Sequence, residues 1–230
     1  MKAIILAGGL GTRLRNTVKN LPKPMAPING RPFLEYQMDY WIEQGVSQFV
    51  LSVGYLNKTI FDHFGANYKG ISIDYCIEDK PLGTGGGMLS AAKNMDEIFL
   101  VLNGDTFIEV ELEKLYNFHI SNNSMWTLSL FKAEMNERYM GMEVDQNGRI
   151  ISLKSREKSL NCYFNGGAYL IDPSILSKID FFENSKVSLE NELLPDLLSS
   201  DTKIYGLECT GRFIDIGIPQ DYFRASEILY

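Results

Sequence analysis

The chain alternates between short apolar runs and longer stretches in which apolar residues recur at helical spacing. Four runs have the composition and length of buried strands, at 2–7, 48–53, 71–77 and 98–103. The intervening stretches predict helices at 33–43, 88–95 and 112–119, and Gly45 stands where the first of them would have its C-cap. Strands that alternate with helices predict a parallel sheet covered on both faces.

The pattern changes after Ser124. Strand-like runs separated by short turns follow at 126–131, 139–145, 149–154 and 162–171, and helical patterns return at 189–198 and 219–229. This second part predicts mixed or antiparallel pairing. We therefore expect one α/β domain over residues 1–230, with a mixed, mostly parallel central sheet flanked by helices.

Composition narrows the class of protein. The 230 residues are 45% hydrophobic and contain no low-complexity tract, as expected of a globular chain. The first apolar run, from Ala3 to Ala7, is too short for a signal-peptide core or a membrane span, so we expect a cytoplasmic protein. Cysteines and histidines have no metal spacing, and we expect neither a zinc site nor a Cys-His nucleophile pair.

Charge is distributed unevenly along the chain. Six basic residues and no acid occur up to Leu34, so the rest of this chain of net charge −7 sums to −13. A nucleic-acid-binding protein would spread its basic residues over a face, and we expect neither nucleic acid nor a membrane as partner. A short basic segment in an acidic body favours a compact anion, and phosphate is the natural candidate.

The basic segment contains the glycine-rich sequence GGLGTRL, directly after the first expected strand. Glycine lets backbone N–H groups approach an anion closely, although a structural turn is an alternative explanation. The dinucleotide motif G-x-G-x-x-G fails at Leu14, and the P-loop motif fails because no Gly-Lys pair is present. Arg13 and Lys23, the latter between two prolines, could reach one triphosphate from two sides.

Two aspartates are candidate metal ligands. Asp105 comes just past the end of an apolar strand, where ligands gather in open α/β sheets, although a turn aspartate is the alternative. Asp215 lies between two isoleucines in a run typical of a buried strand, where a carboxylate is costly unless it is paired or binds a metal. Together the two acids could hold one Mg²⁺ shared with substrate phosphates.

Two further segments are candidates for substrate contacts. The second glycine-rich stretch, 78–88, predicts a flat wall for a nucleobase, and its Glu78 could accept two hydrogen bonds from guanine unless it is a surface residue. In 156–170, a lysine could bind a second phosphate, and an acid and an amide could bind sugar hydroxyls. Surface charge is the alternative for Glu157 and Lys158.

Taken together and in this order, the motifs GGLGTRL, PKP, LGTGGGM, NGDTF, REK, FNGGAYL and FIDIGIPQDY resemble those of the sugar-1-phosphate nucleotidylyltransferases over nearly the whole chain. Within that family the chain is most similar to guanylyltransferases that act on D-glycero-D-manno-heptose 1-phosphate. The resemblance implies a Rossmann-like nucleotidyltransferase domain whose nucleotide-binding part is about 1–123 and whose sugar-phosphate-binding part is about 124–230. The implied reaction converts an NTP, favouring GTP, and a sugar 1-phosphate into an NDP-sugar and pyrophosphate, for surface polysaccharide synthesis.

The resemblance also implies roles for individual residues. Arg13, Lys23, Asp105 and Asp215 would be catalytic, and the last two would bind Mg²⁺. The nucleotide would contact Leu6, Ala7, Gly8, Gly9, Gly11, Thr12, Arg13, Lys23, Glu78, Gly83, Thr84, Gly85, Gly86, Asn103 and Gly104. The sugar phosphate would contact Gly141, Arg156, Glu157, Lys158, Asn165 and Gly166.

Two departures from the family pattern stand out. The Glu-Lys segment is longer than usual, so Arg156 and Lys158 are rivals for the phosphate-binding cation. The sequence ends at Tyr230 without a C-terminal β-helix, so we expect no second activity of the kind that this extension brings.

Other functions stay open. The enzyme could use UTP or dTTP with a hexose 1-phosphate, or CTP with phosphocholine. A non-catalytic regulatory relative would be expected to lack Arg13, Lys23, Asp105 or Asp215, all of which are present. An oxidoreductase is disfavoured by the broken dinucleotide motif. The sequence leaves homo-oligomerisation open.

Overall fold

A computed structural model describes residues 1–9, 11, 13–14, 17–132, 140–154, 162–180 and 185–230. The strands are β1 (Lys2–Leu6), β2 (Pro27–Ile28), β3 (Arg31–Pro32), β4 (Gln48–Val53), β5 (Asn67–Tyr68), β6 (Ile71–Ile77), β7 (Phe99–Asn103), β8 (Thr106–Ile108), β9 (Trp126–Lys132), β10 (Gly141–Val144), β11 (Ile150–Lys154), β12 (Tyr163–Ile171), β13 (Ile204–Glu208) and β14 (Phe213–Asp215). The α-helices are α1 (Phe33–Glu43), α2 (Asn57–Phe64), α3 (Gly83–Ala91), α4 (Leu112–Ser121), α5 (Leu194–Ser199) and α6 (Pro219–Ile228). Shorter helical segments are η1 (Lys23–Met25), η3 (Pro173–Lys178) and the π-helical η4 (Leu189–Leu193).

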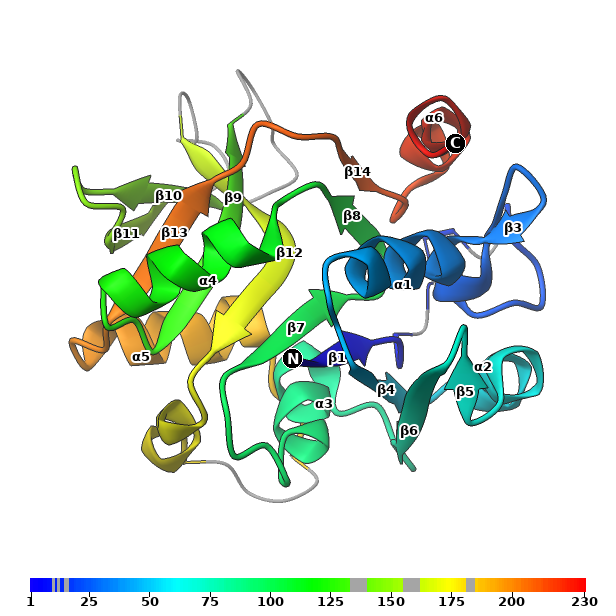
Figure 1. The fold of residues 1–230 in the computed structure, drawn as a ribbon, viewed down its shortest axis with the longest axis horizontal. Coiled ribbons are helices and arrows are strands. Elements are labelled where there is room, and N and C mark those ends of the chain that lie inside the picture. Colours follow the sequence, from blue (N-terminus) through cyan, green and yellow to red (C-terminus); the bar gives the residue numbers. More distant parts are fainter. Residues whose placement is uncertain (10, 12, 15–16, 133–139, 155–161, 181–184) are drawn as a thin grey trace.

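A mixed sheet runs through the molecule (Figure 1). Over the described ranges its ten strands include the path β11-β10-β12-β7-β1-β4-β6-β5, with β9 beside β12 and β13 beside β9. Strands β7, β1, β4 and β6 are parallel, and β12 runs antiparallel to β7. The prediction of a mixed α/β sheet flanked by helices is confirmed, as is the change of pairing after Ser124.

Helices cover both faces of the inner parallel strands, which is why β1, β4 and β7 are apolar over most of their length. On one face, Ile5 and Leu100 pack in a cluster with Trp41 of α1 and with residues of α4. On the other, Ile4 packs in a cluster with Met88 of α3 and with residues of α5. Full burial of each such side chain stabilises the fold by about 1.5–3 kcal/mol, so the sheet's position is strongly fixed.

Helix α3 begins at Gly83, five residues before the start that the sequence predicts. Glycine disfavours helices, but here the N–H groups of Gly85 and Gly86 both donate to the carbonyl oxygen of Val187, at 3.0 and 3.2 Å. A Cβ on Gly83 would stand 2.5 Å from that oxygen. The glycines therefore let a distant segment close the helix N-terminus. The nucleobase wall expected at 78–88 stays a prediction.

Further elements differ from the expectation. The helix expected at 189–198 is divided between η4 and α5. Helix α2 is not predicted, because it is short, mixes polar and apolar residues, and follows Leu56 in the left-handed conformation, with φ of 57°. No helix in the described part of the chain is long and apolar enough to cross a lipid bilayer.

Strands β8 and β14 form a separate two-stranded antiparallel sheet (Figure 1). Thr106 pairs with Asp215, and Phe213 pairs with Ile108. At its outer end, the guanidinium Nε of Arg212 donates to Glu109 at 2.7 Å, and the Arg212 N–H donates to the same carboxylate at 2.9 Å. This small sheet brings the residues around Asp105 against the segment that carries Asp215.

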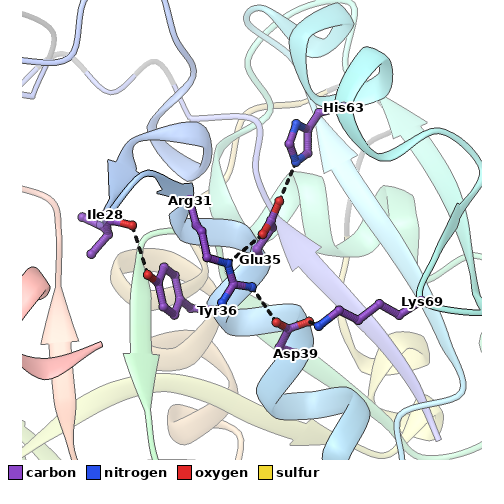
Figure 2. Close-up of polar contacts among 7 residues, drawn as sticks. All are labelled: Ile28, Arg31, Glu35, Tyr36, Asp39, His63 and Lys69. Atoms are coloured by element: carbon purple, nitrogen blue, oxygen red, sulfur yellow. Dashed lines mark hydrogen bonds and ion pairs between the residues drawn. The ribbon is translucent and has the colours of Figure 1, made fainter. Parts of the chain in front are cut away.

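A network of charged side chains fixes α1 to its neighbours (Figure 2). Arg31 Nε donates to Glu35 at 3.0 Å, and Arg31 Nη2 donates to Asp39 at 2.6 Å. His63 of α2 and Lys69, each 2.6–2.7 Å from one of these carboxylates, complete the network. Helix α1 is thus held to α2 and to the β2–β3 hairpin, so its orientation toward the sheet is fixed.

Candidate active site

A cleft of about 590 Å³ opens at the carboxyl ends of β1, β6 and β7, where ligands bind in sheets of this kind. Fifteen of the residues proposed as contacts line it: Leu6, Ala7, Gly8, Gly9, Gly11, Arg13, Lys23, Glu78, Gly83, Thr84, Asn103, Gly104, Asp105, Asn165 and Asp215. Segments that lie far apart in the sequence therefore meet in one cavity.

The glycine-rich loop leaves β1 next to the cation of Lys23. Gly11 has a φ of 58°, a conformation that favours glycine, and a Cβ there would be 3.4 Å from Cβ of Lys23. Prolines on both sides of Lys23 hold its backbone in η1. Arg13 is exposed and also lines the cleft. This arrangement brings two cations and the backbone of a glycine-rich loop to one cleft.

The two aspartates are neighbours in space although 110 positions separate them in the sequence. The ammonium of Lys23 forms an ion pair with Asp105, and the N–H of Ile216 donates to the Asp105 carbonyl oxygen at 2.9 Å. Asp215 is 8% exposed, and its Oδ1 accepts a hydrogen bond from Gly217 N–H at 2.6 Å. Both aspartates therefore line the cleft at this edge, and their sharing of one metal ion stays a prediction.

Glu78 lies at the end of β6, against the glycine-rich loop. Its Oε1 accepts from the Ser52 hydroxyl at 2.9 Å, and its Oε2 accepts from Leu82 N–H at 3.0 Å. A Cβ on Gly8 would overlap the carboxylate, and one on Gly87 would be 2.9 Å from Oε1. Two glycines thus make room for a carboxylate that the protein holds in a fixed orientation beside the cleft.

A buried tyrosine organises the opposite wall. The Tyr169 hydroxyl accepts from the amides of Asn165 and Asn103, at 2.6 and 3.2 Å, and lies 3.5 Å from Oε1 of Glu190. Thr84 donates to the other oxygen of Glu190 at 2.9 Å. Burial raises the pKa of Tyr169 well above its ordinary value, with a further contribution from Glu190, so the phenol keeps its proton. The wall presents fixed amides and one carboxylate.

Several expected residues lie elsewhere. Gly85 and Gly86 pack inside α3, and a Cβ on Gly166 would meet the Ser129 hydroxyl at 2.8 Å, so these glycines serve packing. Gly141 is buried in β10. None of these four lines the cleft within the described residues, and their contacts with substrate stay a prediction. Thr12, Arg156, Glu157 and Lys158 lie outside the described residues.

The sequence reasoning missed other residues of the cleft, including Lys186, Glu190 and Asn191. Glu190 follows Ser188 at the start of an expected helix, where an acid already has a structural explanation as part of the N-terminal turn. Lys186 is an isolated exposed lysine with no accompanying motif. Nothing in the local sequence marks either residue as part of a site.

Comparison with known protein families identifies the class of protein. The nucleotidyl transferase family matches residues 2–230. The chain belongs to this family. The family predicted from the motifs is thus confirmed, and the cleft described above is the candidate active site of a nucleotidyltransferase.

Individual members of the family resemble the chain over its full length. A D-glycero-α-D-manno-heptose 1-phosphate guanylyltransferase of Aneurinibacillus thermoaerophilus is 42% identical over 233 residues, which cover 100% of this chain and 98% of that protein. The enzyme of the same name from Campylobacter jejuni is 39% identical, covering 97% of this chain and 98% of that protein. The crystal structure of HddC from Yersinia pseudotuberculosis superposes with a TM-score of 0.86 at 33% identity, covering 98% of each chain. HddC is also known as a complex with GMP-PN.

Proposed function

We propose that the protein transfers GMP from GTP to D-glycero-α-D-manno-heptose 1-phosphate, forming GDP-heptose and pyrophosphate. The observation that carries the proposal is the 42% identity, over the whole chain, to a guanylyltransferase named for this sugar phosphate. The complex of HddC with a guanine nucleotide supports GTP as the donor. GDP-heptose would then be the activated sugar for synthesis of a surface polysaccharide.

Direct displacement at phosphorus suits the groups in the cleft. A phosphate oxygen of the sugar 1-phosphate attacks the α-phosphorus of GTP, and the bond from that phosphorus to the pyrophosphate oxygen breaks. The attacking oxygen is already ionised, so the reaction needs no general base. Arg13 and Lys23 would bind the triphosphate and stabilise the negative charge that moves onto pyrophosphate, while backbone N–H groups of Gly8, Gly9 and Gly11 would orient it.

Asp105 and Asp215 fit a Mg²⁺ ion by their chemistry. Both carboxylates belong to residues that line the cleft, and oxygen ligands are those that Mg²⁺ prefers. The described part of the chain contains no group of three or more His, Cys, Asp and Glu side chains able to hold a metal. Two carboxylates with substrate phosphates and water therefore form the expected ligand set. When bound, the ion would offset charge on the phosphates during transfer.

The remaining residues of the cleft would define the substrates. Glu78 has an orientation fixed by Ser52 and Leu82, and its carboxylate would accept hydrogen bonds from N1–H and the 2-amino group of guanine. Asn165 and Glu190, on the Tyr169 wall, would bind hydroxyl groups of the sugar.

A substrate matrix tests the proposal. Pyrophosphate release is measured for GTP, ATP, UTP and CTP, each with heptose 1-phosphate, mannose 1-phosphate and glucose 1-phosphate. We expect the highest kcat/KM for GTP with the heptose compound. Higher values for another pair would identify a different transferase, and GTP binding without pyrophosphate release from any pair would identify a non-catalytic relative.

A further inference from the structure

Gln37 is a polar residue on the buried face of α1. Only 2% of it is exposed, and on the same helix Leu34, Met38 and Trp41 belong to the apolar cluster beneath the sheet. A glutamine in such surroundings is costly unless its amide forms hydrogen bonds. Its contacts therefore need an explanation beyond packing.

The Gln37 amide bonds both ends of one short turn. Its Nε2 donates to the carbonyl oxygen of Asn103 at 2.7 Å and to that of Thr106 at 2.5 Å. These residues end β7 and begin β8, and Asp105 lies between them. Because both partners are carbonyl oxygens, the NH₂ group must face the turn. One side chain thus uses both of its protons to fix the segment that carries Asp105.

Two further bonds to this turn come from the backbone. Gly104 N–H donates to the Leu6 carbonyl oxygen at 3.0 Å, and Ile216 N–H donates to the Asp105 carbonyl oxygen at 2.9 Å. The first ties the turn to β1 and the second ties it to the segment of Asp215. Gln37 adds the attachment to α1, on the side away from the cleft.

The oxygen of the Gln37 amide, unlike the nitrogen, forms no stabilising hydrogen bond among the described residues. Its Oε1 is buried and has no hydrogen-bond partner among the described residues. An unsatisfied buried acceptor destabilises the fold, and an apolar side chain of similar size would avoid that cost. The two hydrogen bonds donated by Nε2 therefore explain why a glutamine occupies this position.

We propose that Gln37 is a positioning residue for nucleotidyl transfer, and that it sets the place of the Asp105 carboxylate relative to Asp215 and Lys23. The proposal rests on the proposed function, because it concerns the metal-binding carboxylates of that site. Helix α1 is a suitable support, since the network of Arg31, Glu35 and Asp39 holds it in place (Figure 2). Gln37 touches no substrate and acts only through the turn.

Two variants remove the donors in different ways. Gln37→Leu deletes both hydrogen bonds and leaves an apolar side chain in an apolar cluster. Gln37→Met also removes the NH₂ group but matches the unbranched length of glutamine, so it serves where the leucine variant does not fold. Tyr36→Phe is the matched control, because it removes one bond from α1 to a backbone carbonyl, that of Ile28 at 3.0 Å, away from the cleft (Figure 2).

The experiment measures metal affinity apart from turnover. Free Mn²⁺ is followed by electron paramagnetic resonance during titration of each variant, with a non-hydrolysable GTP analogue present, and thermal melts are recorded in parallel. We expect both Gln37 variants to bind Mn²⁺ about tenfold more weakly than the wild type and to lose about tenfold in kcat, with a change in KM for GTP below about threefold. Tyr36→Phe should lower Tm while Mn²⁺ affinity and kcat stay at wild-type values.

Wild-type Mn²⁺ affinity in a folded Gln37 variant, or an equal loss in Tyr36→Phe, would overturn the assignment. A wild-type protein that binds Mn²⁺ but releases no pyrophosphate would overturn the proposed function instead. In that case the Mn²⁺ titration of the Gln37 variants still decides whether this residue positions Asp105.

Discussion

The ammonium of Lys23 is paired with the carboxylate of Asp105, although the two residues are 82 positions apart. Lys23 comes from the basic segment near the N-terminus, and Asp105 from the turn after β7. The cation is largely shielded from solvent, with 11% of its side chain exposed, whereas 31% of the Asp105 side chain is exposed. The cation proposed to bind phosphate and the acid proposed to bind the metal therefore depend on each other for their positions.

Loss of either cation should affect turnover more than capture of the nucleotide. Arg13→Ala and Lys23→Ala should each lower kcat by more than they raise KM for GTP, because charge accumulates on the leaving pyrophosphate only as the bond breaks. Steady-state kinetics of pyrophosphate release checks this. Lys19→Ala is the control, since Lys19 belongs to the same segment, is exposed and does not line the cleft. A change in KM alone in both variants would limit the segment to nucleotide capture.

The two carboxylates should behave as one unit. Asp105→Asn and Asp215→Asn each remove a negative charge with little change of volume, so turnover should fall by orders of magnitude while the fold persists. The double variant should be little worse than the worse single variant, because both act through one ion. Pyrophosphate release as a function of Mg²⁺ concentration, with thermal melts, measures this. Near-normal activity of one single variant at limiting Mg²⁺ would remove that aspartate from the site.

Much of the architecture is predictable because the parallel strands are buried on both faces. Ile4 and Ile5 point to opposite faces and both are fully buried, so β1 is apolar from Ala3 to Leu6. The start of α3 is not predictable, since its glycines indicate a loop until the carbonyl of Val187 is near them. The role of Gln37 is not predictable for the same reason, since it depends on contacts that are distant in sequence. It lies within the apolar pattern of an expected helix, but its partners belong to a turn more than sixty residues away.

Glu78 should determine the choice of base. Glu78→Ala should lower the ratio of kcat/KM for GTP over UTP by an amount equal to about 1–3 kcal/mol, because guanine loses a bidentate acceptor. Ser52→Ala should have a smaller effect in the same direction, since the Ser52 hydroxyl only orients Oε1. The two ratios are measured with a fixed sugar 1-phosphate. An unchanged ratio in Glu78→Ala would mean that another group recognises the base.

Gly217 should tolerate no side chain. A Cβ there would stand 2.6 Å from Oδ1 of Asp215 and 3.3 Å from Nζ of Lys23, so Gly217→Ala must displace at least one of them. Such overpacking costs about 1–3 kcal/mol, and we expect a lower kcat with a higher Mg²⁺ requirement. Combining Gly217→Ala with Asp215→Asn should add little to the loss in the aspartate variant, because both disturb the same carboxylate. Additive losses would show that Gly217 acts elsewhere.

Acid should weaken the pair that closes β8 onto β14. Hydrogen bonds from Arg212 hold the pKa of Glu109 below its ordinary value of 4.5, so the stabilisation is complete above that pH and is lost as pH falls through the lower folded value. Glu109→Gln should lower Tm by a constant amount from about pH 8 to about pH 5, and the gap to the wild type should shrink at more acidic pH. Circular dichroism melts across pH measure the gap.

Glu111→Gln is the control for that series. Glu111 is exposed, forms no side-chain cap at the start of α4 and belongs to no ion pair in the described ranges. Its Tm should follow the wild type at every pH. A gap for Glu109→Gln that widens in acid would contradict the assigned pair.

Helix α3, from the N-terminal part of the chain, begins on the carbonyl of Val187, and the turn of Asp105 is bonded to Ile216. These two backbone contacts limit which segments can be exchanged between enzymes of this family. Consider a chimaera that takes its first 123 residues from one nucleotidyltransferase and the rest from another. In both of these contacts, the two bonded segments would then come from different proteins. Exchange of whole segments would disturb the edge of the sheet that carries Asp105 along with the wall that carries Asn165. On the proposed function, new sugar specificity should therefore arise by substitutions around Asn165 and Glu190, within an otherwise intact chain.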